Sequence, residues 1–132
     1  MCSFITFNIN DHTIGVDMLD VDKIMKLDKI SSIPNSSDYL EGIIEVENLL
    51  IPAINLKKIL NFSSKDVQPD SSIIVLSYEN KKYGVIVDCV NDINEISEDN
   101  ILKIQSSKYV YGAVKVNDTI IKLLNLKSLI ID

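Results

Sequence analysis

Two stretches of the chain repeat one pattern: Gly42-Ile-Ile-Glu-Val-Glu-Asn-Leu-Leu-Ile-Pro-Ala-Ile-Asn-Leu-Lys57 and Gly112-Ala-Val-Lys-Val-Asn-Asp-Thr-Ile-Ile-Lys-Leu-Leu-Asn-Leu-Lys127. Six aligned positions hold the same residue, and half of the ten others keep an apolar residue opposite an apolar one. Upstream, Ser3–Phe7 matches Ser72–Leu76, and Gly15-Val16 matches Gly84-Val85. An internal repeat of this kind indicates a duplicated structural unit. The repeat halves cover roughly residues 3–60 and 72–130.

Most of the chain is predicted to form short β-strands, because apolar and polar residues alternate and β-branched residues are frequent. The predicted turns hold Asn or Asp, which tolerate positive φ, at Asn10-Asp11, Glu47-Asn48, Asn80-Lys81 and Asn117-Asp118. Evenly spaced short strands with such turns favour small antiparallel barrels. The predicted strands are Phe4–Ile9, Thr13–Met18, Gly42–Val46, Leu49–Asn55, Ser72–Tyr78, Tyr83–Val90, Tyr109–Val116 and Thr119–Leu124.

Helix is predicted only in short pieces, with Asn55 and Asn125 each capping the turn that begins at the following Leu-Lys. The polar segment 61–71 contains Pro69 and is predicted to link the two repeat halves. Each half is of marginal size for a core of its own. We therefore expect residues 1–132 to form a single domain, in which two small barrels share one hydrophobic core.

The charge balance argues against nucleic acid as a partner. The formal net charge is -6, all thirteen basic residues are lysines, and they are scattered along the sequence. A protein that binds a phosphate backbone needs clustered cations. No apolar run reaches the ~20 residues of a membrane-spanning helix, and the N-terminus does not resemble a signal peptide. We therefore expect a cytoplasmic protein without direct membrane insertion.

Residues for catalysis or for cofactor binding are not recognisable in the sequence. The single histidine, His12, lies in a predicted hairpin turn, where a solvated surface role is expected. The acidic group Asp17, Asp20 and Asp22 lacks the glycine and the distal glutamate of a calcium loop, and no His/Cys spacing favours zinc. All four glycines belong to repeat pairs, so none is left for a phosphate-binding loop. We expect no enzyme activity, no metal and no cofactor.

The stretch Tyr39–Leu56 resembles the signature of the CheW-like chemotaxis adaptor family. Phe4–Phe7, Gly15–Ile24, Gly84–Ile93 and the segment from Tyr111 to Leu129 resemble further elements of that family, in the same order. The resemblance implies an all-β fold of two five-stranded SH3-like barrels. It also implies a non-enzymatic adaptor that links chemoreceptor cytoplasmic tips to the regulatory domain of a histidine kinase, and that reaches membrane receptor arrays through these partners. Self-association in arrays stays open.

Carried over position by position, the resemblance places the kinase-binding surface at Ile5, Met18 and Val21. It places the receptor-binding groove around Gly42 and the hairpin that follows, at Glu47 and Asn48. The family usually has Arg-Gly at this turn, so a cation has become an anion here. Neutral change at an exposed turn is one explanation. The other is altered or weakened receptor binding, which would leave a divergent paralogue that binds the kinase or spaces the array.

The predicted kinase-binding residues also have a purely structural interpretation. Met18 and Val21 are spaced as core residues often are, and on an alternating strand only one of Phe4 and Ile5 should face the core. If they are exposed instead, their repeat counterparts Ile74, Val87 and Val90 could present a related surface to a second partner.

Overall fold

The computed structural model describes residues 1–34, 39–62, 66–125 and 128–129. Its strands form two sheets, and the contacts between residues divide the chain into two compact units. Unit 1 comprises Met1–Asp20 and Cys89–Asp132, and unit 2 comprises Val21–Asp88. The predicted all-β fold class is confirmed. No helix among the described residues is long and apolar enough to cross a membrane.

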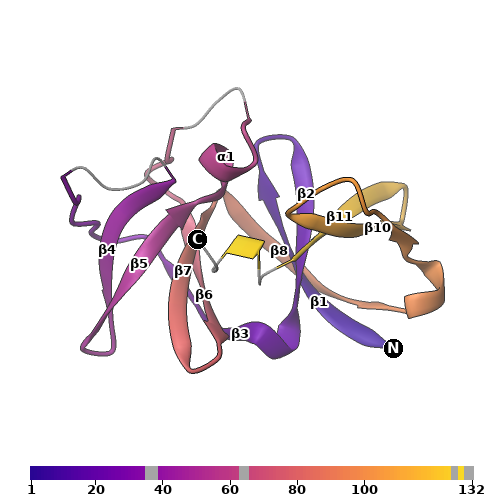
Figure 1. Cartoon of the computed structure of the whole chain (residues 1–132), viewed down its shortest axis with the longest axis horizontal. Helices are drawn as coiled ribbons and strands as arrows, with labels where there is room; N and C mark the ends of the chain where they lie inside the picture. Colours follow the sequence, from indigo (N-terminus) through magenta and orange to yellow (C-terminus); the bar gives the residue numbers. More distant parts are fainter. Residues whose placement is uncertain (35–38, 63–65, 126–127, 130–132) are drawn as a thin grey trace. The chain divides into compact units, whose positions relative to one another are not determined.

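Unit 1 is built on a six-stranded sheet with the order β8-β1-β2-β11-β10-β9 (Figure 1). All neighbours are antiparallel except β2 and β11, which are parallel. Two short 3-10 turns, η1 (Met18–Asp20) and η2 (Glu98–Asn100), follow β2 and β8. The strands are β1 (Cys2–Ile9), β2 (His12–Asp17), β8 (Cys89–Ile96), β9 (Leu102–Lys103), β10 (Val110–Val116) and β11 (Thr119–Leu124).

Unit 2 is built on a five-stranded sheet with the order β3-β6-β7-β5-β4 (Figure 1). Its only parallel pair among the described strands is β5 with β7. The short helix α1 (Leu56–Ile59) follows β5. The strands are β3 (Val21–Lys26), β4 (Leu40–Val46), β5 (Leu49–Asn55), β6 (Ser72–Tyr78) and β7 (Lys81–Val87).

Each unit contains one hairpin that comes from the other repeat half. The β1–β2 hairpin comes from the first half but pairs with strands of the second, whereas the β6–β7 hairpin comes from the second half and pairs with strands of the first. When repeat-related strands are matched, both sheets have the same order, and β9 is an additional two-residue strand in unit 1. The predicted linker 61–71 accordingly lies inside unit 2, although residues 63–65 are outside the described residues.

Two-residue turns with positive φ at both positions connect the β4–β5, β6–β7 and β10–β11 hairpins, because the type I′ geometry matches the twist of antiparallel strands. Glu47 and Asn48 have φ of 51° and 67°, and Asn117 and Asp118 have φ of 48° and 66°. The turn predicted at Asn80-Lys81 is one residue out of place, because Glu79 and Asn80 are the two turn residues. Asn80 takes the second turn position, as Asn48 does in its hairpin.

Each unit has its own cluster of buried apolar residues. In unit 1, Phe4 packs with residues of β8, β10 and β11, and in unit 2 Ile73 packs with residues of β4, β5 and β7. β1 is an inner strand that is buried on both faces, so Phe4 and Ile5 are both buried. The expectation that only one of them faces the interior is therefore wrong.

A buried threonine replaces ladder hydrogen bonds at a bulge between β1 and β8. The Thr6 hydroxyl donates to the carbonyl of Asp92 at 3.1 Å and accepts from the amide of Asp92 at 3.3 Å and from Asn94 Nδ2 at 3.2 Å. The side chain thereby satisfies backbone groups that the bulge leaves unpaired.

Helix α1 begins as predicted, because the Asn55 side chain accepts a hydrogen bond from the Lys57 amide at 2.9 Å. The side chain of Lys57 is buried, and its Nζ lies 2.9 Å from Asp88 Oδ1 and 2.8 Å from the carbonyl of Asp66. This cation is thus paired, as a buried charge must be. The second cap was predicted at Asn125, and the turn that it would cap begins at Leu126 and Lys127, which lie outside the described residues.

Candidate partner-binding site

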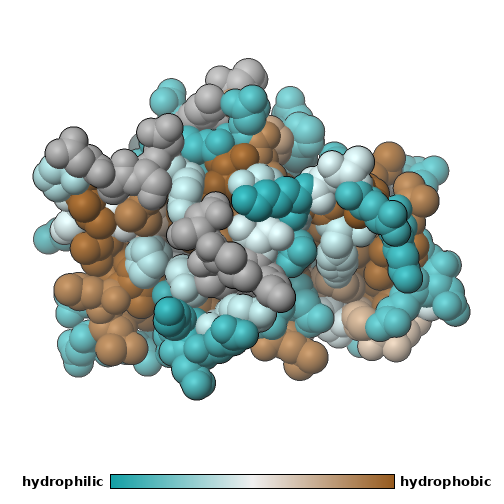
Figure 2. Space-filling model, viewed as in Figure 1, coloured by the Kyte–Doolittle hydropathy of each residue, from teal (hydrophilic) through white to brown (hydrophobic). Residues whose placement is uncertain are grey.

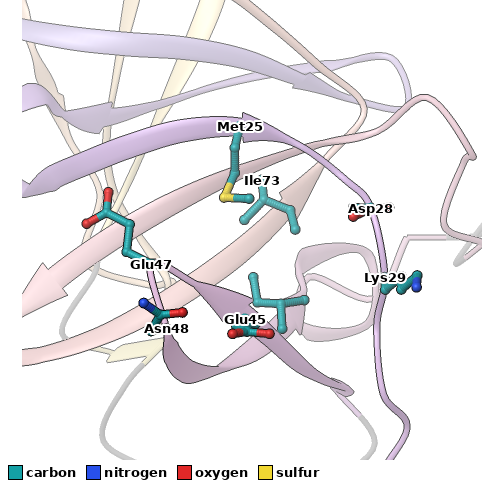
Figure 3. Close-up of a pocket in the computed structure, with 8 residues that line it drawn as sticks. Met25, Asp28, Lys29, Glu45, Glu47, Asn48 and Ile73 are labelled. Carbon is teal, nitrogen blue, oxygen red and sulfur yellow. The ribbon is translucent and has the colours of Figure 1, made fainter.

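The hairpin of β4 and β5 carries the predicted receptor-binding residues Glu47 and Asn48 at its tip, both exposed. A groove of about 340 Å³ lies beside this tip in unit 2 (Figure 3). Met25 and Ile73 point toward each other in it, Asp28 and Lys29 lie at one end, and Glu47 and Asn48 lie at the other. Ile44 and Glu45 complete the lining. The groove therefore combines an apolar floor with a charged rim.

Glu47 is held in an ion pair. Its Oε1 lies 2.8 Å from Nζ of Lys23 on β3, and the two side chains are 67% and 41% exposed. The hydrogen bond from Lys23 and the charge of Lys23 lower the pKa of Glu47. A second pair, Lys82 with Asp22 at 2.9 Å, involves the same edge strand β3, and it raises the pKa of Lys82. The anion at the turn tip is thus balanced by a cation of the same unit.

Gly42 has a structural role at the start of this hairpin. It is buried, and a Cβ atom there would overlap the carbonyl oxygen of Ser31 and lie 2.7 Å from Cγ2 of Ile30. Ser31 and Ile43 exchange two backbone hydrogen bonds of 2.9 and 2.8 Å across this contact. Any contribution of Gly42 to partner binding is therefore indirect, through the position of the hairpin.

The other side of the hairpin carries exposed leucines that sequence reasoning missed. Leu49 is 52% exposed and Leu50 is 72% exposed. With Pro52, Tyr83 and residues of the β6–β7 turn they line a second groove of about 390 Å³. Figure 2 shows apolar side chains over β4 and β5 on this face. The repeat counterpart of Leu50, Ile120, is also exposed, but the sequence alone does not show that either residue faces solvent.

The predicted kinase-binding residues differ in exposure. Ile5 is only 4% exposed on β1, so its side chain is part of the interior. Met18 is 41% exposed in η1, and Val21 is half-buried at the start of β3. Ile5 and Met18 belong to unit 1, whereas Val21 belongs to unit 2. The neighbour of Met18, Leu19, is 93% exposed and was not predicted.

The idea that the second repeat half presents a related apolar surface is wrong for two of its three residues. Ile74 and Val87 are each 1% exposed, and Val90 is half-buried. The reason is that β6 and β7 are inner strands buried on both faces, with unbroken buried runs at Ser72–Leu76 and Gly84–Val87. Like Leu50 and Ile120, the repeat pair Ile24 and Ile93 is exposed, on the outer strands β3 and β8.

Titratable groups elsewhere do not form a metal-binding cluster within the described parts of the chain. His12 begins β2 instead of occupying the turn, and its Nδ1 lies 3.3 Å from Nζ of Lys122. In unit 2, burial raises the pKa of Glu41, but hydrogen bonds from Asn55 and Lys58 outweigh it, so the pKa is lowered. These contacts hold β4 against α1.

Comparison with known proteins gives one consistent match. The model of the CheW-like domain family matches residues 3–132. The chain is 28% identical over 130 residues to the chemotaxis protein CheW of Thermotoga maritima, covering 96% of this chain and 85% of that protein. It is 23% identical over 135 residues to the CheW of Treponema pallidum, covering 95% and 79%. The crystal structure of the scaffolding protein TtCheW from Thermoanaerobacter tengcongensis superposes with a TM-score of 0.88 at 29% identity, covering 95% and 89%.

Proposed function

This chain belongs to the CheW-like domain family, and on that premise we propose that it is a non-enzymatic chemotaxis adaptor. It couples the cytoplasmic tips of chemoreceptors to the regulatory domain of a histidine kinase, in the cytoplasm. The β4–β5 hairpin is the observation that carries the proposal, because it carries exposed leucines, borders a groove and is tied to β3 by an ion pair. Exposed apolar side chains beside charged groups are typical of partner-binding surfaces.

The receptor tip docks at the tip of the β4–β5 hairpin, over Glu47, Asn48 and the adjacent Leu49. The kinase regulatory domain docks at the exposed Met18 of unit 1, and Val21 is a separate kinase contact of unit 2. Ile5 supports the second site from the interior, because it is buried beneath the surface of β1. Binding of each partner biases the other only if both contacts form on one adaptor molecule. Several modest contacts of this kind gain strength when they are multiplied in an array.

One substitution at each site tests whether the two partners bind at separate sites. Leu49→Asp should weaken binding of a receptor fragment and leave binding of the kinase regulatory domain unchanged, and Met18→Asp should do the reverse. Both side chains are about half exposed, so neither change disturbs a core. Calorimetric titration with each fragment separately is the measurement. If each substitution weakens both partners equally, the two sites are not separate and the assignment fails.

The alternative is a paralogue that binds the kinase or spaces the array without coupling to receptors, and Glu47 motivates it. Glu47→Arg restores the cation of the family pattern, whereas Glu79→Arg makes the same change at the same turn position of the β6–β7 hairpin. If the wild-type chain binds receptor poorly and only Glu47→Arg raises the affinity, by about tenfold, charge at this turn decides receptor coupling. Receptor binding by the wild-type chain, unchanged by either substitution, excludes the alternative.

A further inference from the structure

Unit 1 holds a groove of about 420 Å³ that the proposed function does not use. Its apolar lining includes Phe4 on β1, Ile101 and Ile104 on either side of β9, and Tyr111 on β10. Leu102, on β9 itself, is 69% exposed. The contact between β9 and β10 fixes one wall, because a Cβ atom at Gly112 would lie 2.7 Å from Cγ2 of Ile101 and 3.1 Å from the carbonyl of Leu102.

The rim of this groove is acidic. Asp17, at the end of β2, and Glu98, in η2, both line it, and Lys103 is the one lysine of the lining. In the part of the chain that the structure describes, neither carboxylate forms an ion pair with a lysine. Glu98 accepts a hydrogen bond from the Cys2 thiol at 3.3 Å, and Asp17 accepts one from the amide of Leu19 at 2.9 Å. The rim therefore carries two carboxylates against one lysine.

The acidic groups around the groove also shift the pKa values of their neighbours. Burial and then the charges of Asp17, Cys2, Asp20 and Glu98 raise the pKa of Tyr111. Burial and the charge of Asp17 raise the pKa of Asp20. A cation placed in the groove would oppose both effects, because it favours the ionised forms.

We propose that this groove docks a cationic, amphipathic segment of a partner protein, with apolar side chains against Tyr111, Ile101 and Ile104 and lysine or arginine against Asp17 and Glu98. The groove is open, which suits a chain segment better than an enclosed small molecule. Nucleic acid is repelled by the acidic rim. A second copy of this chain is a poor occupant, because it carries a net charge of -6 and no arginine.

The groove belongs to unit 1, whereas the β4–β5 hairpin belongs to unit 2, and neither Met18 nor Val21 lines it. The proposal therefore adds a third surface to the two proposed above. Its test needs a variant that changes the charge of the rim without affecting folding. Glu98→Lys meets this requirement, because Glu98 is exposed in a three-residue 3-10 turn.

The probe is a synthetic helical peptide of roughly four turns with leucine along one face and lysine elsewhere. Two matched peptides replace every lysine by glutamate or every leucine by glutamine. The ¹⁵N-labelled protein is titrated with each and followed by its amide resonances. We expect only the first peptide to bind, with shifts concentrated at Glu98, Leu102 and Tyr111. Glu98→Lys should weaken binding about tenfold or more. Asp118→Lys makes the same charge change at a side chain that is 98% exposed, and should weaken binding less than about twofold.

Thiol modification gives a second measurement on the unaltered chain. Cys2 lines the groove, whereas Cys89 is an exposed thiol of the same unit outside it. The leucine–lysine peptide should slow modification of Cys2 and leave Cys89 unaffected. The proposal would be overturned if Glu98→Lys and Asp118→Lys weakened peptide binding equally. It would also be overturned if the glutamine peptide bound as tightly as the leucine–lysine peptide, or if the resonance shifts lay away from the groove. Self-association that Glu98→Lys abolishes would overturn it too, since the occupant would then be a second copy. The Glu98→Lys variant should bind kinase and receptor fragments as tightly as the wild-type chain does. A loss of peptide binding alone would then concern the groove and not the proposed function.

Discussion

Replacing Gly42 by alanine should destabilise the protein more than replacing Gly15 by alanine, although both glycines belong to repeat pairs. At Gly42 the new methyl group meets the carbonyl of Ser31, a backbone atom that cannot move without loss of the two hydrogen bonds between Ser31 and Ile43. At Gly15 it meets side-chain ends, Cγ2 of Ile121 at 3.2 Å and Cδ2 of Leu123 at 3.3 Å, which can shift by a few tenths of an ångström.

The two costs follow from these contacts. Each backbone hydrogen bond contributes about 0.5–1.5 kcal/mol, so losing both costs about 1–3 kcal/mol. A Gly→Ala change gains about 0.4–1 kcal/mol from the unfolded chain when the native backbone accepts it. We expect a net loss of about 1.3 kcal/mol for Gly42→Ala, which is about 0.6 M in the midpoint of urea unfolding. For Gly15→Ala we expect a change within about 1 kcal/mol.

Urea titration followed by far-ultraviolet circular dichroism measures both midpoints under the same conditions. Gly112→Ala is a useful third variant, because Gly112 is the repeat counterpart of Gly42 and faces a side-chain atom at 2.7 Å and a carbonyl at 3.1 Å. Its midpoint should lie between the other two. A midpoint for Gly42→Ala equal to that for Gly15→Ala would refute the argument that close backbone approach sets the cost.

Three further predictions test other contacts. Lys57→Met leaves Asp88 without its buried cation and should cost about 3 kcal/mol in urea unfolding, whereas the partly exposed Lys58→Met should cost about 0.5 kcal/mol. The pKa of Glu41 in the folded protein is below 4.5, so its contribution to the free energy of unfolding is present above that pH and is lost as the pH falls through the folded pKa. The free energy of unfolding of Glu41→Gln should therefore be lower than that of wild type at pH 7 and should converge with it in acid. Thr6→Val leaves backbone groups at the bulge unsatisfied and should cost about 1–2 kcal/mol in urea unfolding.

The duplication and most strands could be predicted from the sequence because both depend on local signals, but β3, β9 and most of β8 were missed. Alternation in Ser72–Tyr78 and the Asn-containing pairs at the hairpin turns are readable within a few residues. The position of the turn at Glu79-Asn80 was missed by one residue, because Asn-Lys and Glu-Asn fit the local pattern almost equally well. The Asn55 cap was predictable for the same reason, since its partner is two residues away.

Long-range pairing could not be predicted. The β1–β2 and β6–β7 hairpins are similar in sequence, so the repeat alone does not say which half each of them joins. The pair of Lys23 with Glu47 joins residues on β3 and at the β4–β5 turn, and β9 is too short to leave a pattern. The burial of Ile5 was missed because alternation assumes one wet face, which an inner strand such as β1 does not have.

The exchange of hairpins also bears on how the chain folds during synthesis. Unit 2 is continuous from Val21 to Asp88, so all of its strands have been translated before the last third of the protein. β1 and β2 are made first, yet their partners β8 and β11 come from the far end of the polypeptide. Closing such a long loop slows folding. The earliest hairpin to leave the ribosome must therefore wait, with its sheet edges open, for the final strands to be made.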